Sequence, residues 1–132
     1  LGVAEVMQEG KDVTVLAWGA QIEICQKAIE MAQAQGISCE LIDLRSILPW
    51  DVETVVKSVT KTGRLVINHE APLTGGFAGE IAATIQQRCF LHLESPIARV
   101  CGLDTPYPLA LEREYVADHL KTFEAIVASV QF

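Results

Sequence analysis

Segments rich in aliphatic and β-branched residues alternate with segments of helical periodicity, and this order constrains the fold of the 132-residue chain more than any other feature. In the helical segments the apolar residues recur at intervals of three and four, which places them on one face. Strands separated by such helices form parallel βαβ units, and the resulting sheet is covered on both faces. We therefore predict an α/β fold: a three-layer αβα arrangement with a doubly wound, mainly parallel sheet. The predicted strands are 13–18, 39–44, 64–69 and 97–101.

Glycine marks the ends of the first two predicted helices, because Gly36 and Gly63 follow their apolar periodicity. The predicted helices are 22–32, 52–59, 77–89 and a last one that begins at Glu114. In the last helix we expect the inward side chains to be Val116, Leu120, Phe123, Val127 and Val130. The chain shows no repeat or linker, so we expect a single domain over residues 1–132. Its abrupt beginning leads us to expect that it is a piece of a longer chain.

Composition and charge exclude several classes of protein. Hydrophobic residues make up 50% of the chain and charged residues 20%, which is typical of a globular α/β domain. No apolar run reaches the roughly 18 residues of a bilayer span, so we expect no membrane segment. The net charge of −7 argues against a nucleic-acid surface and favours a basic protein partner. The four cysteines lie far apart among apolar residues, so we predict buried thiols rather than disulfides or metal ligands.

A glycine-rich turn, with Gly75, Gly76 and Gly79, precedes the third predicted helix. A dinucleotide fingerprint would need glycine where Thr74 stands, and a phosphate-binding P-loop would need a lysine that the turn lacks. Glu80, in the first helical turn, would satisfy the helix dipole and repel a phosphate. We therefore predict a turn whose glycines permit tight geometry or the close approach of another backbone.

His69 and Glu70 stand at the carboxyl end of a predicted strand, where ligand sites of parallel sheets gather. Neighbouring strand residues point to opposite faces, so the two are not expected to act on one atom. His69 is the single catalytic candidate, and a histidine at a loop or subunit contact is the favoured alternative. No histidines show metal-ligand spacing, so no metal site is expected. Trp50 and Tyr107 are large loop side chains that either close the core or anchor an interface.

Four stretches together carry a resemblance to a known family. They are AWGAQ at 17–21, CELIDLRSILPWD at 39–51, KTGRLVINHEAPLTGGFAGEI at 61–81 and RVCGLDTPYP at 99–108. In these stretches the chain resembles the C-terminal domain of the β subunits of thiamine-dependent 2-oxoacid dehydrogenases, within the transketolase C-terminal domain family. The third and fourth stretches resemble the branched-chain (2-oxoisovalerate) branch most.

The resemblance implies a reaction in which a branched 2-oxoacid is oxidatively decarboxylated and its acyl group passes to a lipoyl group. It also implies that thiamine diphosphate and Mg²⁺ are held between an α subunit and the N-terminal domain of the β subunit. We therefore expect no catalytic, cofactor-binding or metal-binding residue on this chain, and no activity of the chain alone. The location that the resemblance implies is the mitochondrial matrix or the bacterial cytoplasm.

The role that the resemblance implies for this domain is assembly. The expected partners are an α subunit, a second β subunit in an α₂β₂ heterotetramer, and the basic peripheral subunit-binding domain of a dihydrolipoyl acyltransferase. Carried over by position, the acceptors for the acyltransferase fall on Glu94 and on the carboxylate of Phe132. Glu94 as an ordinary solvated loop charge remains the alternative. The expected subunit-interface residues are His69, Glu70, Gly75, Gly76, Phe77 and Tyr107.

Three alternatives to the branched-chain branch stay open. One is the equivalent domain of a pyruvate dehydrogenase β subunit, because LALEREYVADHLK at 109–121 departs from the branched-chain pattern. The second is the equivalent domain of a transketolase-like or deoxyxylulose-phosphate-synthase-like enzyme. The third is a free-standing oxidoreductase or nucleotide-binding domain of flavodoxin type.

Overall fold

The chain folds around one five-stranded sheet with the strand order β1-β3-β2-β4-β5. The computed structural model describes residues 1–106 and 109–132. The strands are β1 (Glu5–Gln8), β2 (Val13–Ala17), β3 (Cys39–Asp43), β4 (Leu65–Pro72) and β5 (Ala98–Gly102). The helices are α1 (Gln21–Gln33), α2 (Val52–Thr62), α3 (Phe77–Cys89), α4 (Glu112–Tyr115) and α5 (His119–Gln131), with short 3₁₀ turns η1 (Phe90–His92) and η2 (Leu109–Leu111).

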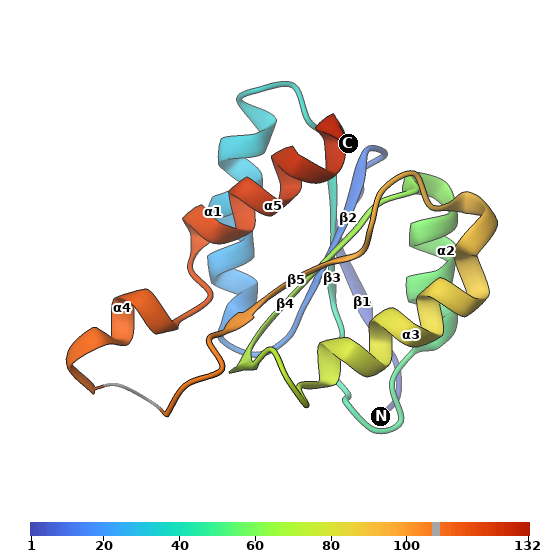
Figure 1. Cartoon of the computed structure of the whole chain (residues 1–132). Coiled ribbons are helices and arrows are strands. Elements are labelled where there is room, and N and C mark those ends of the chain that lie inside the picture. The colour runs from blue at the N-terminus through green and yellow to red at the C-terminus, as the bar shows by residue number, and fades with distance from the viewer. Residues whose placement is uncertain (107–108) are drawn as a thin grey trace.

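Three layers are visible in Figure 1: α1 and α5 cover one face of the sheet, and α2 and α3 cover the other. Strands β3, β2, β4 and β5 pair parallel with one another, in that order, as predicted. Successive side chains along a strand pack alternately into two apolar clusters, one on each face of the sheet. In β4, Val66 belongs to the cluster under α1 and α5, whereas Leu65 and Ile67 belong to the cluster under α2 and α3. The predicted αβα fold is therefore confirmed.

Strand β1 was not among the predicted strands. It pairs antiparallel with β3 at the edge of the sheet, with Glu5 opposite Asp43. All four of its residues are exposed. A strand that buries neither face shows no apolar alternation, so the sequence pattern gave no signal for it.

The last helix begins later than predicted, so the expected start at Glu114 is wrong. Glu114 lies in the short α4, and α5 begins at His119, after the cap residue Asp118, whose carboxylate accepts a hydrogen bond from the Lys121 N–H at 2.8 Å. The prediction that Leu120 faces inward is also wrong, because this side chain is 50% exposed. The buried residues of α5 are Thr122, Ile126 and Ser129.

The four cysteines are free thiols, as predicted, and three of them are buried while Cys101 is half-buried. Burial raises the pKa of Cys25 to about 12, so this thiol stays protonated at neutral pH. Among the described residues no helix has the length and hydropathy of a membrane span.

Candidate functional site

The carboxyl edge of the sheet brings together the ends of β2 and β4 and the loop that follows β5. His69 and Glu70, near the end of β4, differ in burial: His69 is 2% exposed, whereas Glu70 lies open to solvent, and both line one cavity at this edge. Strand β4 runs to Pro72, beyond the predicted end at residue 69, because Pro72 pairs with Gly102 after an irregularity in the ladder.

The imidazole of His69 is buried against other side chains of the chain and is not placed to exchange protons with a ligand. Its Nε2 lies 3.6 Å from the Cys101 sulfur, and its ring centroid lies 5.6 Å from that of Trp18. The Nδ1 atom has no hydrogen bond to any described residue. Burial lowers the pKa of His69, against the opposing effect of the backbone groups of His69 and Ala71, so the ring is neutral at pH 7.

The glycine turn is shaped by this ring. Gly76 caps the N-terminus of α3, and a Cβ added there would lie 2.6 Å from His69 Nε2 and 2.5 Å from the Pro72 carbonyl oxygen. Gly75 has a φ of +75°, which favours glycine. The predicted tight turn is therefore confirmed, and the closest approach is to a side chain and a carbonyl of the same chain.

A second link joins this turn to the loop after β5. The carboxylate of Asp104 accepts hydrogen bonds from the backbone N–H of Thr74, at 2.8 Å, and from the Thr74 hydroxyl. These hydrogen bonds hold the pKa of Asp104 below its usual value. The loops that follow β4 and β5 are thus held together as one unit.

The turn does not fit a thiamine diphosphate or its metal ion. A diphosphate at the N-terminus of α3 would meet the carboxylate of Glu80 in the first turn of that helix. Within residues 1–106 and 109–132, no cluster of three or more His, Cys, Asp or Glu side chains has the arrangement of a metal site.

Aromatic side chains close one side of this edge. The ring of Phe77 lies edge-on to those of Trp18, at 6.3 Å, and Trp50, at 6.4 Å. Trp50 also packs against the cluster under α2 and α3, so of its two predicted roles the structure shows closure of the core. A cavity of about 290 Å³ lies here, lined by Trp18, Gly19, Ile47, His69, Glu70, Ala71 and Phe77. Tyr107, a predicted interface residue, lies outside the described residues.

A second cavity, of about 360 Å³, shares the lining residues Glu70 and Ala71 with the first. Gln21, the first residue of α1, lines it and is 6% exposed, yet its Oε1 atom has no hydrogen bond to any described residue. The sequence predictions did not include Gln21. The available signal was its position, because Gln21 closely follows the end of β2, at the same edge of the sheet as His69.

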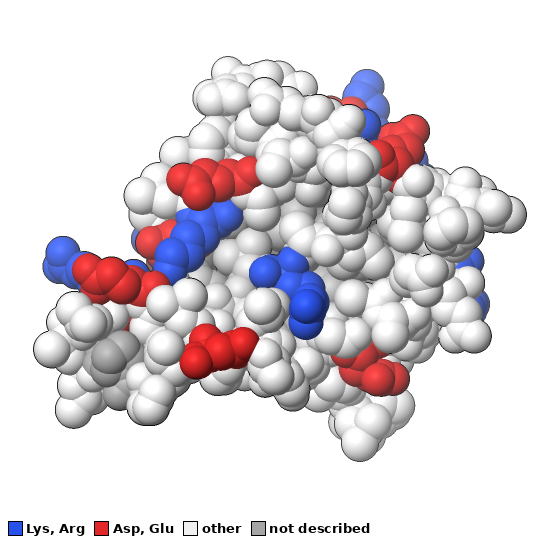
Figure 2. All heavy atoms as spheres, in the orientation of Figure 1, with Lys and Arg blue, Asp and Glu red and all other residues white. Residues whose placement is uncertain are grey.

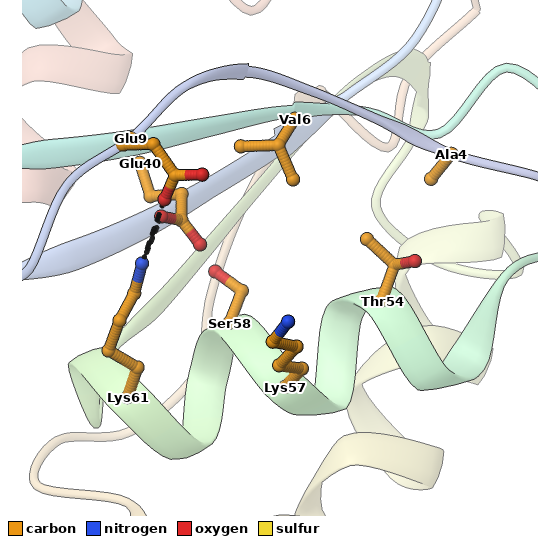
Figure 3. A pocket seen from close by; sticks show the side chains of 8 residues that line it. All are labelled: Ala4, Val6, Glu9, Glu40, Thr54, Lys57, Ser58 and Lys61. Carbon is orange, nitrogen blue, oxygen red and sulfur yellow. Dashed lines mark hydrogen bonds and ion pairs between the residues drawn. The ribbon is translucent and has the colours of Figure 1, made fainter.

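A pocket of about 360 Å³ lies between β1 and α2 and is shown in Figure 3. Its charged lining residues pair with one another and so connect the edge of the sheet to α2. The nearly buried carboxylate of Glu40 pairs with the Lys61 ammonium, which also lies 3.1 Å from Glu9. Burial alone would raise the pKa of Glu40, but hydrogen bonds from Lys61, Ser58 and the Gly10 N–H outweigh it and hold the pKa low. The Glu40 carboxylate is therefore already satisfied by this chain.

At the opposite end of the sheet, Arg64 contacts the predicted acceptor Glu94 and the last turn of α5, which precedes the second predicted acceptor, Phe132. Arg64 Nη1 lies 3.1 Å from Glu94 Oε2, and Arg64 Nε donates to the Ser129 carbonyl at 3.0 Å. Ser129 lies in the last turn of α5, three residues before Phe132, whose side chain is 80% exposed. Glu94 is therefore an exposed carboxylate with an internal partner, and it lies near the end of α5.

The charge of −7 is not gathered into one acidic patch on the face that Figure 2 shows. On that face acidic and basic side chains are interspersed, a basic group lies near the centre, and most of the remaining surface is uncharged. Electrostatic attraction on this face therefore depends on individual carboxylates rather than on a continuous acidic field.

Comparison with known proteins identifies the fold. A family model described as "Transketolase, C-terminal domain" matches residues 2–121. A solved structure titled "Split gene transketolase, inactive beta4 tetramer" superposes with a TM-score of 0.82 at 27% identity, over 98% of this chain and 42% of that one.

Two curated relatives separate the possible branches of the family. The chain is 66% identical, over 96% of its length, to a mitochondrial 2-oxoisovalerate dehydrogenase subunit beta of Dictyostelium discoideum. It is 38% identical, over its whole length, to a pyruvate dehydrogenase E1 component subunit beta of Leifsonia xyli. The chain spans 34% of the first relative and 40% of the second.

Replacing Gly76 with alanine should lower the free energy of unfolding by about 1–3 kcal/mol, because the methyl group must displace the His69 ring or the Pro72 carbonyl. Urea denaturation followed by circular dichroism measures the change. Gly79→Ala is the matched control: the nearest atom would be Arg99 Nη1 at 3.5 Å, so this change should add about 0.5–1 kcal/mol through helix propensity. Equal effects of the two changes would contradict the proposed packing of His69 on Gly76.

Replacing Lys61 with methionine should lower the free energy of unfolding at pH 7 by about 1–2 kcal/mol, because Glu40 then keeps a nearly buried charge without its partner. Lys57→Met, one turn earlier in α2 and without an ion pair to a described residue, should change it by less than about 0.5 kcal/mol. The folded pKa of Glu40 is lowered, so its contribution is present above the unfolded value of about 4.3 and is lost as the pH falls through the folded pKa. The difference between wild type and Lys61→Met should therefore shrink below about pH 4; a constant difference would disprove the role given to Glu40.

Proposed function

Because the chain belongs to the transketolase C-terminal domain family, we propose that it is the C-terminal domain of the β subunit of a branched-chain 2-oxoacid dehydrogenase. One observation carries this assignment: the identity of 66% to the 2-oxoisovalerate dehydrogenase subunit beta, against 38% to the pyruvate dehydrogenase subunit beta. In the complete enzyme, thiamine diphosphate and Mg²⁺ supply the decarboxylation chemistry from parts other than this chain.

The domain serves assembly, and no residue of this chain takes part in the chemical step. Its carboxyl edge contacts a second β subunit, and the α subunit completes an α₂β₂ heterotetramer. Glu70 and Gly75 are exposed there and are available to a neighbouring chain, whereas His69 supports the turn from within. Gly76 and Phe77 have contacts inside the chain, with the His69 ring and with Trp18 and Trp50, so they hold the shape of this surface.

The other end of the sheet receives the basic subunit-binding domain of the dihydrolipoyl acyltransferase core. Glu94 and the carboxylate of Phe132 are the acceptors. The hydrogen bond of Arg64 to the Ser129 carbonyl and its ion pair with Glu94 support this proposal, because they join Glu94 to the last turn of α5, three residues before Phe132. The compartment is the mitochondrial matrix or the bacterial cytoplasm, according to the source; the name of the Dictyostelium relative places that protein in the mitochondrion.

A direct test uses the complete β subunit that contains this chain, co-expressed with its α subunit and supplied with thiamine diphosphate and Mg²⁺. We expect decarboxylation of 2-oxoisovalerate with a kcat/KM at least about tenfold above that for pyruvate, since a pocket distinguishes a branched from a short aliphatic group by about 1–3 kcal/mol. A preference for pyruvate would replace the branched-chain assignment by the pyruvate dehydrogenase alternative. The 132-residue chain alone should show no decarboxylation, and activity of the chain alone would refute an assembly role.

The docking proposal predicts that Glu94→Lys weakens binding of the acyltransferase subunit-binding domain by at least about tenfold at low salt, because an attraction becomes a repulsion. Isothermal titration calorimetry on the α₂β₂ complex at two ionic strengths measures the loss, and the wild-type affinity should fall as salt is added. Glu30→Lys, an exposed charge reversal on α1, is the matched control and should leave the affinity within about twofold of wild type. If the two reversals weaken binding equally, net charge rather than Glu94 governs the interaction.

A further inference from the structure

The residue that ends α2 supports Glu94 through both its backbone and its side chain. The Glu94 N–H donates to the Gly63 carbonyl at 2.8 Å. Gly63 has a φ of +73°, and a Cβ added there would lie 3.0 Å from the Glu94 Cγ and Oε2 atoms and from the His92 carbonyl oxygen. The Glu94 side chain therefore lies over the residue type that leaves room for it.

Arg64 holds the same carboxylate from the inner side. Its guanidinium pairs with Glu94 Oε2, and its other contacts are with the carbonyl oxygens of Asp12 and Ser129. The Arg64 side chain is 22% exposed and that of Glu94 is 59% exposed, so a partner that approaches this end of the domain meets the carboxylate before the guanidinium. Among the described residues, Glu94 Oε1 has no hydrogen-bond partner, so one oxygen remains for another molecule.

The cation Arg64 stands in a site proposed for a basic partner, where two effects of opposite sign compete. Repulsion between exposed cations, screened at about 0.15 M salt, is worth at most about fivefold in affinity. Holding one side chain in place is worth about two- to tenfold, because an ordered side chain loses less rotamer freedom when a partner binds. Arg64 holds two groups, Glu94 and the last turn of α5, so its positioning effect should exceed its repulsion.

We propose that Arg64 and Gly63 are positioning residues of the docking surface: both fix the Glu94 carboxylate, and Arg64 fixes it relative to the last turn of α5. The proposal rests on the proposed function, because it takes Glu94 as an acceptor for the basic subunit-binding domain. It goes further in one respect, since the geometry held by an internal cation, rather than the number of negative charges, sets the affinity.

Removing the charge of Arg64 distinguishes position from charge. Arg64→Met should weaken binding of the subunit-binding domain to the complete α₂β₂ complex by at least about threefold at about 0.15 M salt, as measured by isothermal titration calorimetry. Lys11→Met is the matched control, because Lys11 is exposed, lines the same cavity of about 520 Å³ beside Glu94 and forms no ion pair with a described residue. It removes the same charge without a contact to Glu94, so the affinity should stay unchanged or rise by up to about fivefold. Wild-type or tighter binding by Arg64→Met overturns the proposal.

A second change moves the carboxylate and leaves every charge in place. Gly63→Ala should weaken binding by at least about twofold, because the added Cβ displaces the Glu94 side chain. Gly36→Ala is its control: Gly36 has a φ of +80° and no atom within 4 Å of an added Cβ, so this change adds similar backbone strain without a contact to Glu94. This pair carries the test if Arg64→Met prevents assembly, and equal effects of the two changes would count against positioning.

A third variant separates this proposal from the proposed function. In a complex that carries Glu94→Ala, Arg64→Met should weaken binding by a smaller factor than in wild type, because the carboxylate that it positions is gone; a general loss of stability would act equally in both. If Glu94→Ala itself leaves the affinity unchanged, Glu94 is not an acceptor, and the docking site and the positioning role both fail. If Glu94→Ala weakens binding but Arg64→Met and Gly63→Ala do not, the docking site stands and the positioning role alone is overturned.

Discussion

The burial of both faces of β4 is the constraint on which the rest of the structure depends. This strand lies between β2 and β5, and its residues from Leu65 to His69 are buried. Its side chains alternate between the two apolar clusters, so helices must cover both sides of the sheet. The last residues of β4 lie at the carboxyl edge of the sheet, and the candidate site lies there with them.

The same burial explains the role of His69. A histidine at a strand end suggests catalysis, but here the ring fills the space above Gly76 and contacts Trp18. A neutral imidazole in that position supports the turn and the start of α3. Glu70, one residue later, is exposed to solvent. The edge therefore has an inner layer that holds its shape and an outer layer that is available for contacts.

The elements that could be predicted are those that the local order of apolar and glycine residues in the sequence determines. The four parallel strands follow from runs of buried aliphatic residues, and the left-handed Gly63 marks the end of α2 as expected. Strand β1 could not be predicted, because it is held by pairing with β3 rather than by an apolar face of its own. The start of α5 was recoverable from the cap residue Asp118, which the apolar spacing of the preceding residues obscured. The surroundings of Gln21 and Arg64 depend on contacts between distant segments, which no local pattern contains.

The three contacts of Arg64 have a thermodynamic consequence. Its guanidinium also donates to the Asp12 carbonyl at 3.3 Å, so one side chain joins the entry to β2, the segment before β5 and the last turn of α5. A ligand that draws Glu94 away from Arg64 changes how firmly that last turn is held. By linkage, a change that loosens this turn through Arg64 alters the affinity for such a ligand by the same factor as the ligand alters the stability of the turn. The stability of the last turn of α5 and the affinity of a ligand at Glu94 are therefore coupled through Arg64.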